Sequence, residues 1–204
     1  ADLVRASLLQ WDGSPEEGWP SWAFSNHDAP RAITRWADGF DQGQIARLNL
    51  LLLLALRGNP IIYQGEELGL PQGHVAFEDL QDPEAIANWP HTLGRDGART
   101  PLPWAHNAPQ AGFSHANRTW LKLDAAHTSH AIDRQLPDPA SLVSYTRRLL
   151  TTRRAQPALV QGTSLVLDTP AQIVAFIREA DGAEVLCAFN LGDQAMAWQP
   201  PARF

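Results

Sequence analysis

Hydrophobic and polar positions along the chain form blocks that predict helices and strands in a regular order. Helical spacing of apolar residues marks residues 1–10 and 139–156, and a run of strong helix-forming residues marks residues 42–57. The second block is apolar on most faces and is stopped by the Gly-Asn-Pro sequence at 58–60, so we expect a well-buried helix there. The third block has one apolar face and is followed by Pro157, which predicts an amphipathic helix.

Short apolar runs predict two strands in the first third of the chain. A turn-rich sequence at residues 11–18 separates the first helix from the run at 19–26, and a second run follows at 60–63. Polar residues come directly after each run, so we expect two buried strands with chemistry at their C-terminal ends. Strand, helix and strand in this order predict an α/β fold with a parallel sheet, and both a barrel and a doubly wound sheet fit.

The periodicity changes near the C-terminus. Three runs of strand type, separated by turn sequences, predict a small antiparallel sheet; they are residues 164–167, 173–178 and 184–190. We therefore expect two domains, residues 1–157 and residues 158–204. The segment at about 69–133 is rich in Pro, Gly, His and Trp with little periodicity, which predicts a long surface loop with short helices.

Charge and cysteine content exclude several classes of protein. The chain has 16 basic and 22 acidic residues and a net charge of -6, so we expect no nucleic-acid partner. Four arginines in the third helical block are expected on its solvated face; they are Arg147, Arg148, Arg153 and Arg154. The single cysteine, Cys187, lies in an apolar run and is expected to be a buried thiol. The apolar run at 48–56 is too short to span a bilayer, so we expect no membrane insertion.

The segment FSNHDAPR, residues 24–31, carries the strongest chemical signal. His27 and Asp28 stand side by side at the end of a predicted strand, where they suit hydrogen bonds to the neighbouring hydroxyls of a sugar. By their chemistry alone they suit a metal ion or a structural hydrogen bond equally well.

Three segments in order resemble the alpha-amylase superfamily, glycoside hydrolase family 13, in its alpha-glucosidase and oligo-1,6-glucosidase branch. Residues 25–31, SNHDAPR, are similar to its fourth conserved region, and residues 62–69, IYQGEELG, are similar to the segment around its last barrel strand. Residues 94–104, GRDGARTPLPW, resemble the RDxxRTPMQW loop of that branch, with Pro103 in place of the usual Gln.

The resemblance implies the C-terminal portion of a (β/α)8 TIM barrel, with its last two strands and their helices, followed by a small antiparallel β domain. A closed barrel takes about 250 residues, so the chain is expected to need the missing N-terminal part of the barrel, or another chain, as its partner. The true N-terminus is then expected upstream of Ala1. We expect a cytoplasmic protein, and a signal peptide stays an open alternative.

The activity that the resemblance implies is that of a retaining alpha-glucosidase, which cleaves or transfers alpha-linked glucose from small oligosaccharides through two carboxylates. Asp28 matches a third carboxylate, which holds sugar hydroxyls and supports the oxocarbenium-like transition state. His27 matches a neighbouring residue that binds a sugar hydroxyl, and Arg95 and Arg99 are expected to contact substrate from the loop over the pocket mouth.

Other residues of the same motifs are second choices for the site; they are Asn26, Arg31 and Glu66. Arg31 and Glu66 are equally expected to form a structural charge network beneath it. The nucleophile and general acid of the family lie on earlier strands, in segments such as GFRxD, and none precedes Trp11, so we expect the isolated chain to be inactive. The family's calcium loop also lies upstream. We expect no cofactor and no metal site in this chain, since the pair His127 and His130 lacks further ligands.

Two other classes compete with the enzyme. A non-catalytic scaffold of the same fold, such as a transporter heavy chain, usually loses site residues, whereas Asn26, His27 and Asp28 are all present. A carbohydrate-binding module agrees with eight Trp residues and a final β segment, but it does not explain the helix predicted at 42–57.

Overall fold

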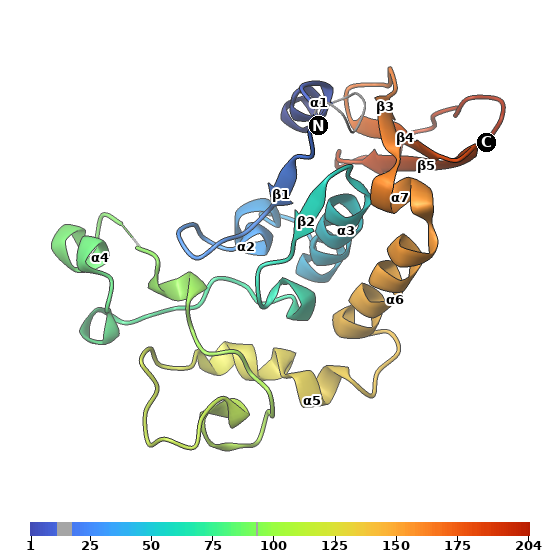
Figure 1. Ribbon diagram of the computed structural model, residues 1–204. Coiled ribbons are helices and arrows are strands. Elements are labelled where there is room, and N and C mark those ends of the chain that lie inside the picture. Colours follow the sequence, from blue (N-terminus) through green and yellow to red (C-terminus); the bar gives the residue numbers. More distant parts are fainter. Residues whose placement is uncertain (12–17, 93) are drawn as a thin grey trace. The chain divides into compact units, whose positions relative to one another are not determined.

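A computed structural model describes residues 1–11, 18–92 and 94–204 of the protein (Figure 1). Its helices and strands, in chain order, are α1 (Asp2–Leu9), β1 (Ser21–Ala23), α2 (Ala32–Trp36), α3 (Gln42–Ala55), β2 (Asn59–Ile61), α4 (Pro83–Asn88), α5 (Ile132–Gln135), α6 (Leu142–Ala155), α7 (Pro157–Gln161), β3 (Thr163–Val166), β4 (Ile173–Ala180) and β5 (Ala183–Asn190). Most of the turn predicted at 11–18 lies outside the described residues.

The three helices predicted from the sequence at residues 1–10, 42–57 and 139–156 are confirmed as α1, α3 and α6. Helix α3 ends three residues before Gly58, which has a φ of +118°. A Cβ at this position would lie 2.2 Å from the carbonyl oxygen of Pro20, so the close approach of the two segments requires glycine. The amide of Asn59 then donates a hydrogen bond to the same oxygen, at 2.8 Å.

Strands β1 and β2 pair in a two-stranded sheet, at the places where the apolar runs predict strands. The prediction that they are buried is wrong for this chain. In each strand the central residue, Trp22 or Pro60, is half-buried and its two neighbours are exposed. A sheet of two strands leaves both outer edges open, and within the described residues no further strand joins it.

The small antiparallel sheet predicted near the C-terminus is confirmed, with the order β3-β4-β5 (Figure 1). The longest pairing joins β4 to β5, from Ile173 opposite Asn190 to Ala180 opposite Ala183. Cys187 lies on β5 and is buried as expected, and burial raises the pKa of its thiol to about 11.

The chain divides into two compact units, and each is described by itself. The first unit holds residues 1–22, 51–60 and 149–204, and the second holds residues 23–50 and 61–148. The second unit has two small groups of buried apolar side chains, one around Ile33, Ala37 and Ala46 and one around Leu68, Leu70 and Val143. The domain division predicted at residue 157 stays a prediction.

The long segment at 69–133 is confirmed as irregular structure with short helices. Besides α4 it contains short 3₁₀ helices at Phe77–Asp79, Asp96–Ala98, Pro109–Gly112 and Ala125–His130. The sequence patterns did not give the positions of the short helices α2, α4, α5 and α7, because four to six residues are too few for a periodic apolar face. In the described part of the chain, no helix is long and apolar enough to cross a bilayer.

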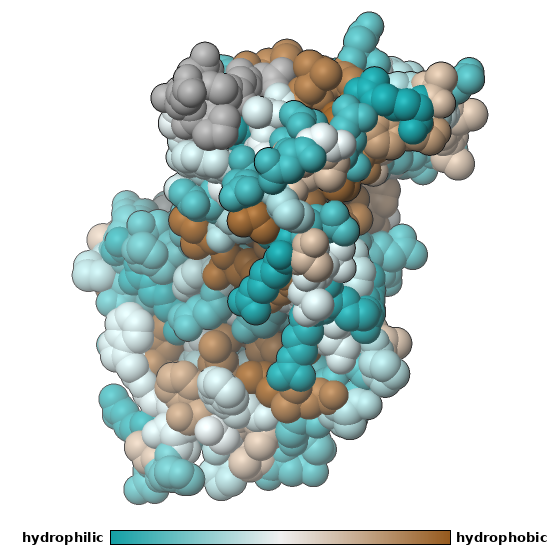
Figure 2. All heavy atoms as spheres, turned by 45° about the vertical axis from the view of Figure 1, so that its right-hand side comes forward, coloured by the Kyte–Doolittle hydropathy of each residue, from teal (hydrophilic) through white to brown (hydrophobic). Residues whose placement is uncertain are grey.

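Large apolar side chains reach the surface of the first unit. They include Leu3, Leu9, Leu51, Val160 and Leu165, with Leu3 86% exposed. Figure 2, which draws one face of the molecule, shows hydrophobic atoms exposed among hydrophilic ones. Arg153 is the opposite case, a charged residue that is buried. The sequence predicted it on the solvated face of α6, but its guanidinium donates hydrogen bonds to backbone carbonyls at the end of α3.

Candidate active site

The loop after β1 is shaped by the side chain of Asn26. Its Oδ1 accepts hydrogen bonds from the backbone amides of Asp28, at 2.8 Å, and Ala29, at 2.9 Å. This is an Asx turn, in which the side-chain oxygen of an asparagine accepts a hydrogen bond from the backbone amide of the residue two positions later. It holds the backbone of Asp28 in place, so Asn26 acts on the loop conformation.

Asp28 lies at the centre of a cluster of cationic and polar groups. Its Oδ1 accepts a hydrogen bond from Nη2 of Arg99 at 3.0 Å and lies 3.7 Å from Nη1 of Arg95. Its Oδ2 lies 3.4 Å from Nε2 of His27. The side chains of His27 and Asp28 are 66% and 55% exposed, so both are open to a ligand.

Arg99 ties the motif loop to the loop at 94–104. Its Nε donates to the carbonyl oxygen of His27 at 2.9 Å, while its Nη2 reaches Asp28. The structure thus brings together the four residues predicted for the site, although Asp28 and Arg99 are 71 positions apart in sequence.

Arg31 lies beneath this cluster and is 1% exposed. Its guanidinium donates to the carbonyl oxygens of Gln64, at 2.8 Å, and Ala98, at 3.1 Å, and stacks 5.1 Å from the centre of the Tyr63 ring. Burial lowers the pKa of Arg31. Its contacts with backbone carbonyls join three loops below the site.

Glu66 belongs to a separate set of contacts. It accepts hydrogen bonds from the Ser25 hydroxyl at 2.7 Å and from the Tyr63 amide at 2.9 Å. Burial raises the pKa of Glu66 above its ordinary value. Among the described residues, no direct ion pair joins Arg31 and Glu66, but each charge acts on the other: Glu66 favours the charged form of Arg31, and Arg31 favours the charged form of Glu66. The structural charge network expected from the sequence stays a prediction.

The chemistry of the cluster suits a neutral, hydroxyl-rich ligand. A carboxylate fixed by two arginines, with an imidazole beside it, offers both hydrogen-bond acceptors and donors within a few ångströms. The paired histidines considered for metal binding are occupied elsewhere: His127 contacts the carbonyl oxygen of Pro71 at 3.1 Å, and His130 contacts that of Leu68 at 3.1 Å.

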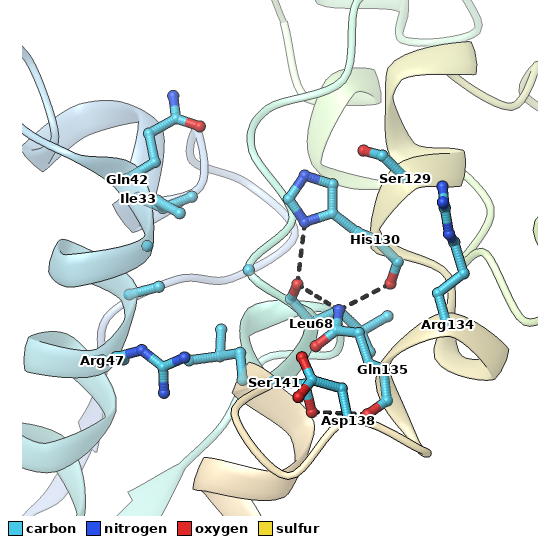
Figure 3. Close-up of a pocket in the computed structure, with 14 residues that line it drawn as sticks. Ile33, Gln42, Arg47, Leu68, Ser129, His130, Arg134, Gln135, Asp138 and Ser141 are labelled. Atoms are coloured by element: carbon cyan, nitrogen blue, oxygen red, sulfur yellow. Dashed lines mark hydrogen bonds between the residues drawn. The ribbon is translucent and has the colours of Figure 1, made fainter.

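A pocket of about 330 Å³ in the second unit is lined by His130, and no residue of the Asp28 cluster lines it. Figure 3 shows His130 and Gln135 both directed at the carbonyl oxygen of Leu68. Arg134 lines the pocket on the side of His130, and Ile33 and Arg47 lie on the opposite side (Figure 3). None of the residues predicted for the site from sequence lines this pocket among the described residues.

A family model described as "Alpha amylase, catalytic domain" matches residues 2–162. The chain belongs to the alpha-amylase family. The match includes the Asp28 cluster, and it ends just before β3.

Relatives within the alpha-amylase family carry the names of glucosidases. The chain is 44% identical over 201 residues to a protein of Rhizobium meliloti named "Probable alpha-glucosidase", covering 98% of this chain and 36% of the relative. It is 29% identical over 221 residues to an oligo-1,6-glucosidase of Halalkalibacterium halodurans, covering 98% of this chain and 39% of the relative. The chain thus spans little more than a third of the length of these relatives.

Solved structures of the family agree with the fold. The alpha-glucosyl transfer enzyme XgtA matches with a TM-score of 0.84 and 44% identity, over 92% of this chain and 35% of that chain. A trehalulose synthase, MutB, matches with a TM-score of 0.80 and 28% identity, over 93% of this chain and 37% of that chain. Family membership therefore rests on both sequence and fold.

One residue that contacts the Asp28 cluster in this member of the alpha-amylase family was not predicted from the sequence. Asp82 is buried and makes two hydrogen bonds to the guanidinium of Arg95, at 2.6 Å and 3.0 Å. The sequence did hold a partial signal, since Asp82 precedes a proline and thus reads as the N-cap of a helix, which it is for α4. Its pairing with Arg95 is a tertiary contact that local spacing does not reveal.

Proposed function

We propose that this chain is a C-terminal part of a retaining alpha-glucosidase that cleaves or transfers alpha-linked glucose from small oligosaccharides. In this proposal Asp28 is a supporting carboxylate of the reaction centre, and His27 binds a hydroxyl of the same sugar. Arg95 and Arg99 orient Asp28 and contact the substrate at the pocket mouth. Asn26, Arg31 and Glu66 hold the loops in place.

The observation that carries the proposal is the cluster around Asp28. One carboxylate oxygen is held by Arg99 at 3.0 Å with Arg95 nearby, so its second oxygen stays available next to His27. A carboxylate held in this way can accept hydrogen bonds from sugar hydroxyls, and those bonds strengthen as positive charge develops on the ring.

The covalent chemistry of a retaining glycosidase needs two further carboxylates. One attacks the anomeric carbon and displaces the leaving oxygen, which the other protonates; water or an acceptor sugar then takes the glucosyl group from the enzyme. We propose that both come from the barrel strands upstream of this chain, and that β1 and β2 are the last two strands of that barrel. The open edges of their sheet, and the exposed apolar residues elsewhere on the chain, support the proposal that further protein packs against this chain.

The test uses the complete reading frame that contains this chain. The Asp28→Asn variant is expected to lower kcat/KM for p-nitrophenyl alpha-glucoside by about 100- to 1,000-fold, since it removes a charge that supports the transition state. Asp38→Asn is the matched control, because Asp38 is an exposed carboxylate outside the cluster, and it is expected to keep native activity. Native activity in Asp28→Asn, or a complete protein that neither hydrolyses nor transfers glucose, would refute the proposal.

A further inference from the structure

We propose that Asp82 is a positioning residue, which acts through Arg95 to hold the Asp28 carboxylate in its working orientation. The inference rests on the proposed function, because it assigns a task within the same site. Asp82 itself touches no substrate in this proposal. Its task is to keep a long, flexible cation in one position.

Asp82 binds Arg95 through both carboxylate oxygens. Oδ1 accepts from Nη2 at 2.6 Å, and Oδ2 accepts from Nε at 3.0 Å and from the Arg95 backbone amide at 2.8 Å. The side chain of Asp82 has no exposed surface, whereas that of Arg95 is 39% exposed. A two-point contact between a planar guanidinium and a carboxylate fixes direction as well as distance.

Asp82 is in turn held from below. Its backbone amide donates to Oδ2 of Asp96 at 2.8 Å, and the amide of Gln81 donates to the same oxygen at 2.6 Å. Asp96 is completely buried. The carboxylate that holds Arg95 therefore belongs to a packed support rather than to a mobile surface loop.

The backbone just before Arg95 can approach this support only because residue 94 is glycine. Gly94 has a φ of +59°, and a Cβ there would lie 2.3 Å from Cβ of Ala85 and 2.9 Å from Oδ2 of Asp82. The close approach places the Arg95 amide within hydrogen-bond distance of Asp82. The backbone amide and the side chain of Arg95 therefore both bind the Asp82 carboxylate.

The nitrogen of Arg95 that Asp82 leaves free faces the reaction centre. Nη1 lies 3.7 Å from Oδ1 of Asp28, the same oxygen that Arg99 binds at 3.0 Å. Arg95 thus links a buried carboxylate to an exposed one. Without Asp82, the side chain would regain rotamer freedom, and the Asp28 carboxylate would lose one of its two cationic neighbours for part of the time.

A purely structural task for Asp82 is the alternative, since the residue also caps α4 through a 3.3 Å contact with the amide of Glu84. The two tasks differ in how Asp82 and Arg95 combine. If Asp82 acts through Arg95, removing it from a protein that already lacks Arg95 costs no further activity. If it only supports the fold, the two losses add.

The experiment is a double-mutant cycle in the complete protein, with kcat and KM measured for p-nitrophenyl alpha-glucoside. Asp82→Asn and Arg95→Met are each expected to lower kcat/KM by about 10- to 100-fold, mainly through kcat. The double variant is expected to be no slower than Arg95→Met. Asp124→Asn is the control, because Asp124 likewise caps a short helix through the Ala126 amide but lies outside the cluster, and its kcat/KM should stay native.

Additive losses in the double variant, or native kcat/KM in Asp82→Asn, would overturn the inference. If Asp82→Asn does not fold, Arg95→Lys decides, because lysine keeps the charge but cannot make the two-point contact. A loss of about 10-fold supports the inference and native activity refutes it. The proposed function fails separately, when Asp28→Asn stays active; the inference alone fails when Asp28→Asn is inactive and the cycle is additive.

Discussion

At the scale of single residues, the site contrasts an exposed carboxylate with a buried one. The side chain of Asp28 is 55% exposed, and its carboxylate oxygens contact Arg99, Arg95 and His27. The side chain of Asp82 has no exposed surface. In the proposed site, exposure suits a group that receives a sugar, and burial suits a group that holds its neighbour still. Both carboxylates contact Arg95, which is the basis for the two different roles that we propose for them.

The buried carboxylate of Asp82 makes the free energy of unfolding depend on pH. The hydrogen bond from Arg95 holds the pKa of Asp82 well below its ordinary value, so the unfolded chain binds a proton more readily than the folded one. The stabilisation is complete above the unfolded pKa, about 4, and is lost as the pH falls toward the folded pKa. Between pH 6 and pH 3, the melting temperature of Asp82→Asn is therefore expected to fall less than that of the native protein.

Thermal unfolding followed by circular dichroism at a series of pH values checks this expectation. Asp38→Asn serves as the control and should keep the native dependence on pH, because Asp38 is exposed and outside the cluster. Parallel curves for Asp82→Asn and the native protein would contradict the assignment of this acid sensitivity to Asp82.

At the scale of elements, the end of α3 depends on arginines far away in sequence. Arg153 on α6 donates to the carbonyl oxygens of Leu54, Leu56 and Gly58. Arg178 on β4 donates to that of Ala55 at 2.9 Å and is completely buried. The last carbonyls of a helix lack partners within the helix and carry partial negative charge, so guanidinium groups satisfy both needs.

Removing one of these arginines is expected to destabilise the protein. Arg178→Met would leave the carbonyls of Ala55, Gly162 and Thr163 buried without that donor, at a cost of about 3 kcal/mol in the free energy of unfolding. Urea denaturation measures the loss. Arg154→Met, at an exposed position of α6, should change the free energy by less than about 0.5 kcal/mol. Equal stability of the two variants would contradict the capping role.

The elements and residues that the sequence predicted correctly are those with a local signal. Helices α3 and α6 have fourteen residues each; α3 is a run of helix-forming residues that is apolar on most faces, and α6 has one apolar face. The turns between β3, β4 and β5 are marked by turn sequences. Arg153 was misplaced because its buried setting depends on carbonyls about a hundred positions away. Asp82 was overlooked for the same reason, since its N-cap signal is local and its contact with Arg95 is not.

At the scale of the whole molecule, the chain presents surfaces that favour further protein contacts. The two-stranded sheet has open edges, and Leu3, Leu51 and Leu165 are exposed. The relatives are almost three times as long as the stretch that matches, which agrees with the proposal that the reaction centre is completed by an upstream segment.

The 204-residue chain expressed alone is accordingly expected to be inactive and to associate or aggregate. Size-exclusion chromatography with light scattering, together with a glucosidase assay, checks both expectations. The complete reading frame is the positive control and should be active. A monodisperse, folded monomer of 22.5 kDa from the chain alone would contradict the proposed dependence on an upstream segment.

The close approach at Gly94 has a consequence for how this sequence can vary. Since a Cβ at residue 94 would meet Cβ of Ala85 at 2.3 Å, the two positions share one small space. A saturation library should find almost no accepted replacement at 94, and only glycine or serine beside the native alanine at 85. Across species, the residues at positions 85 and 94 would then change together or not at all.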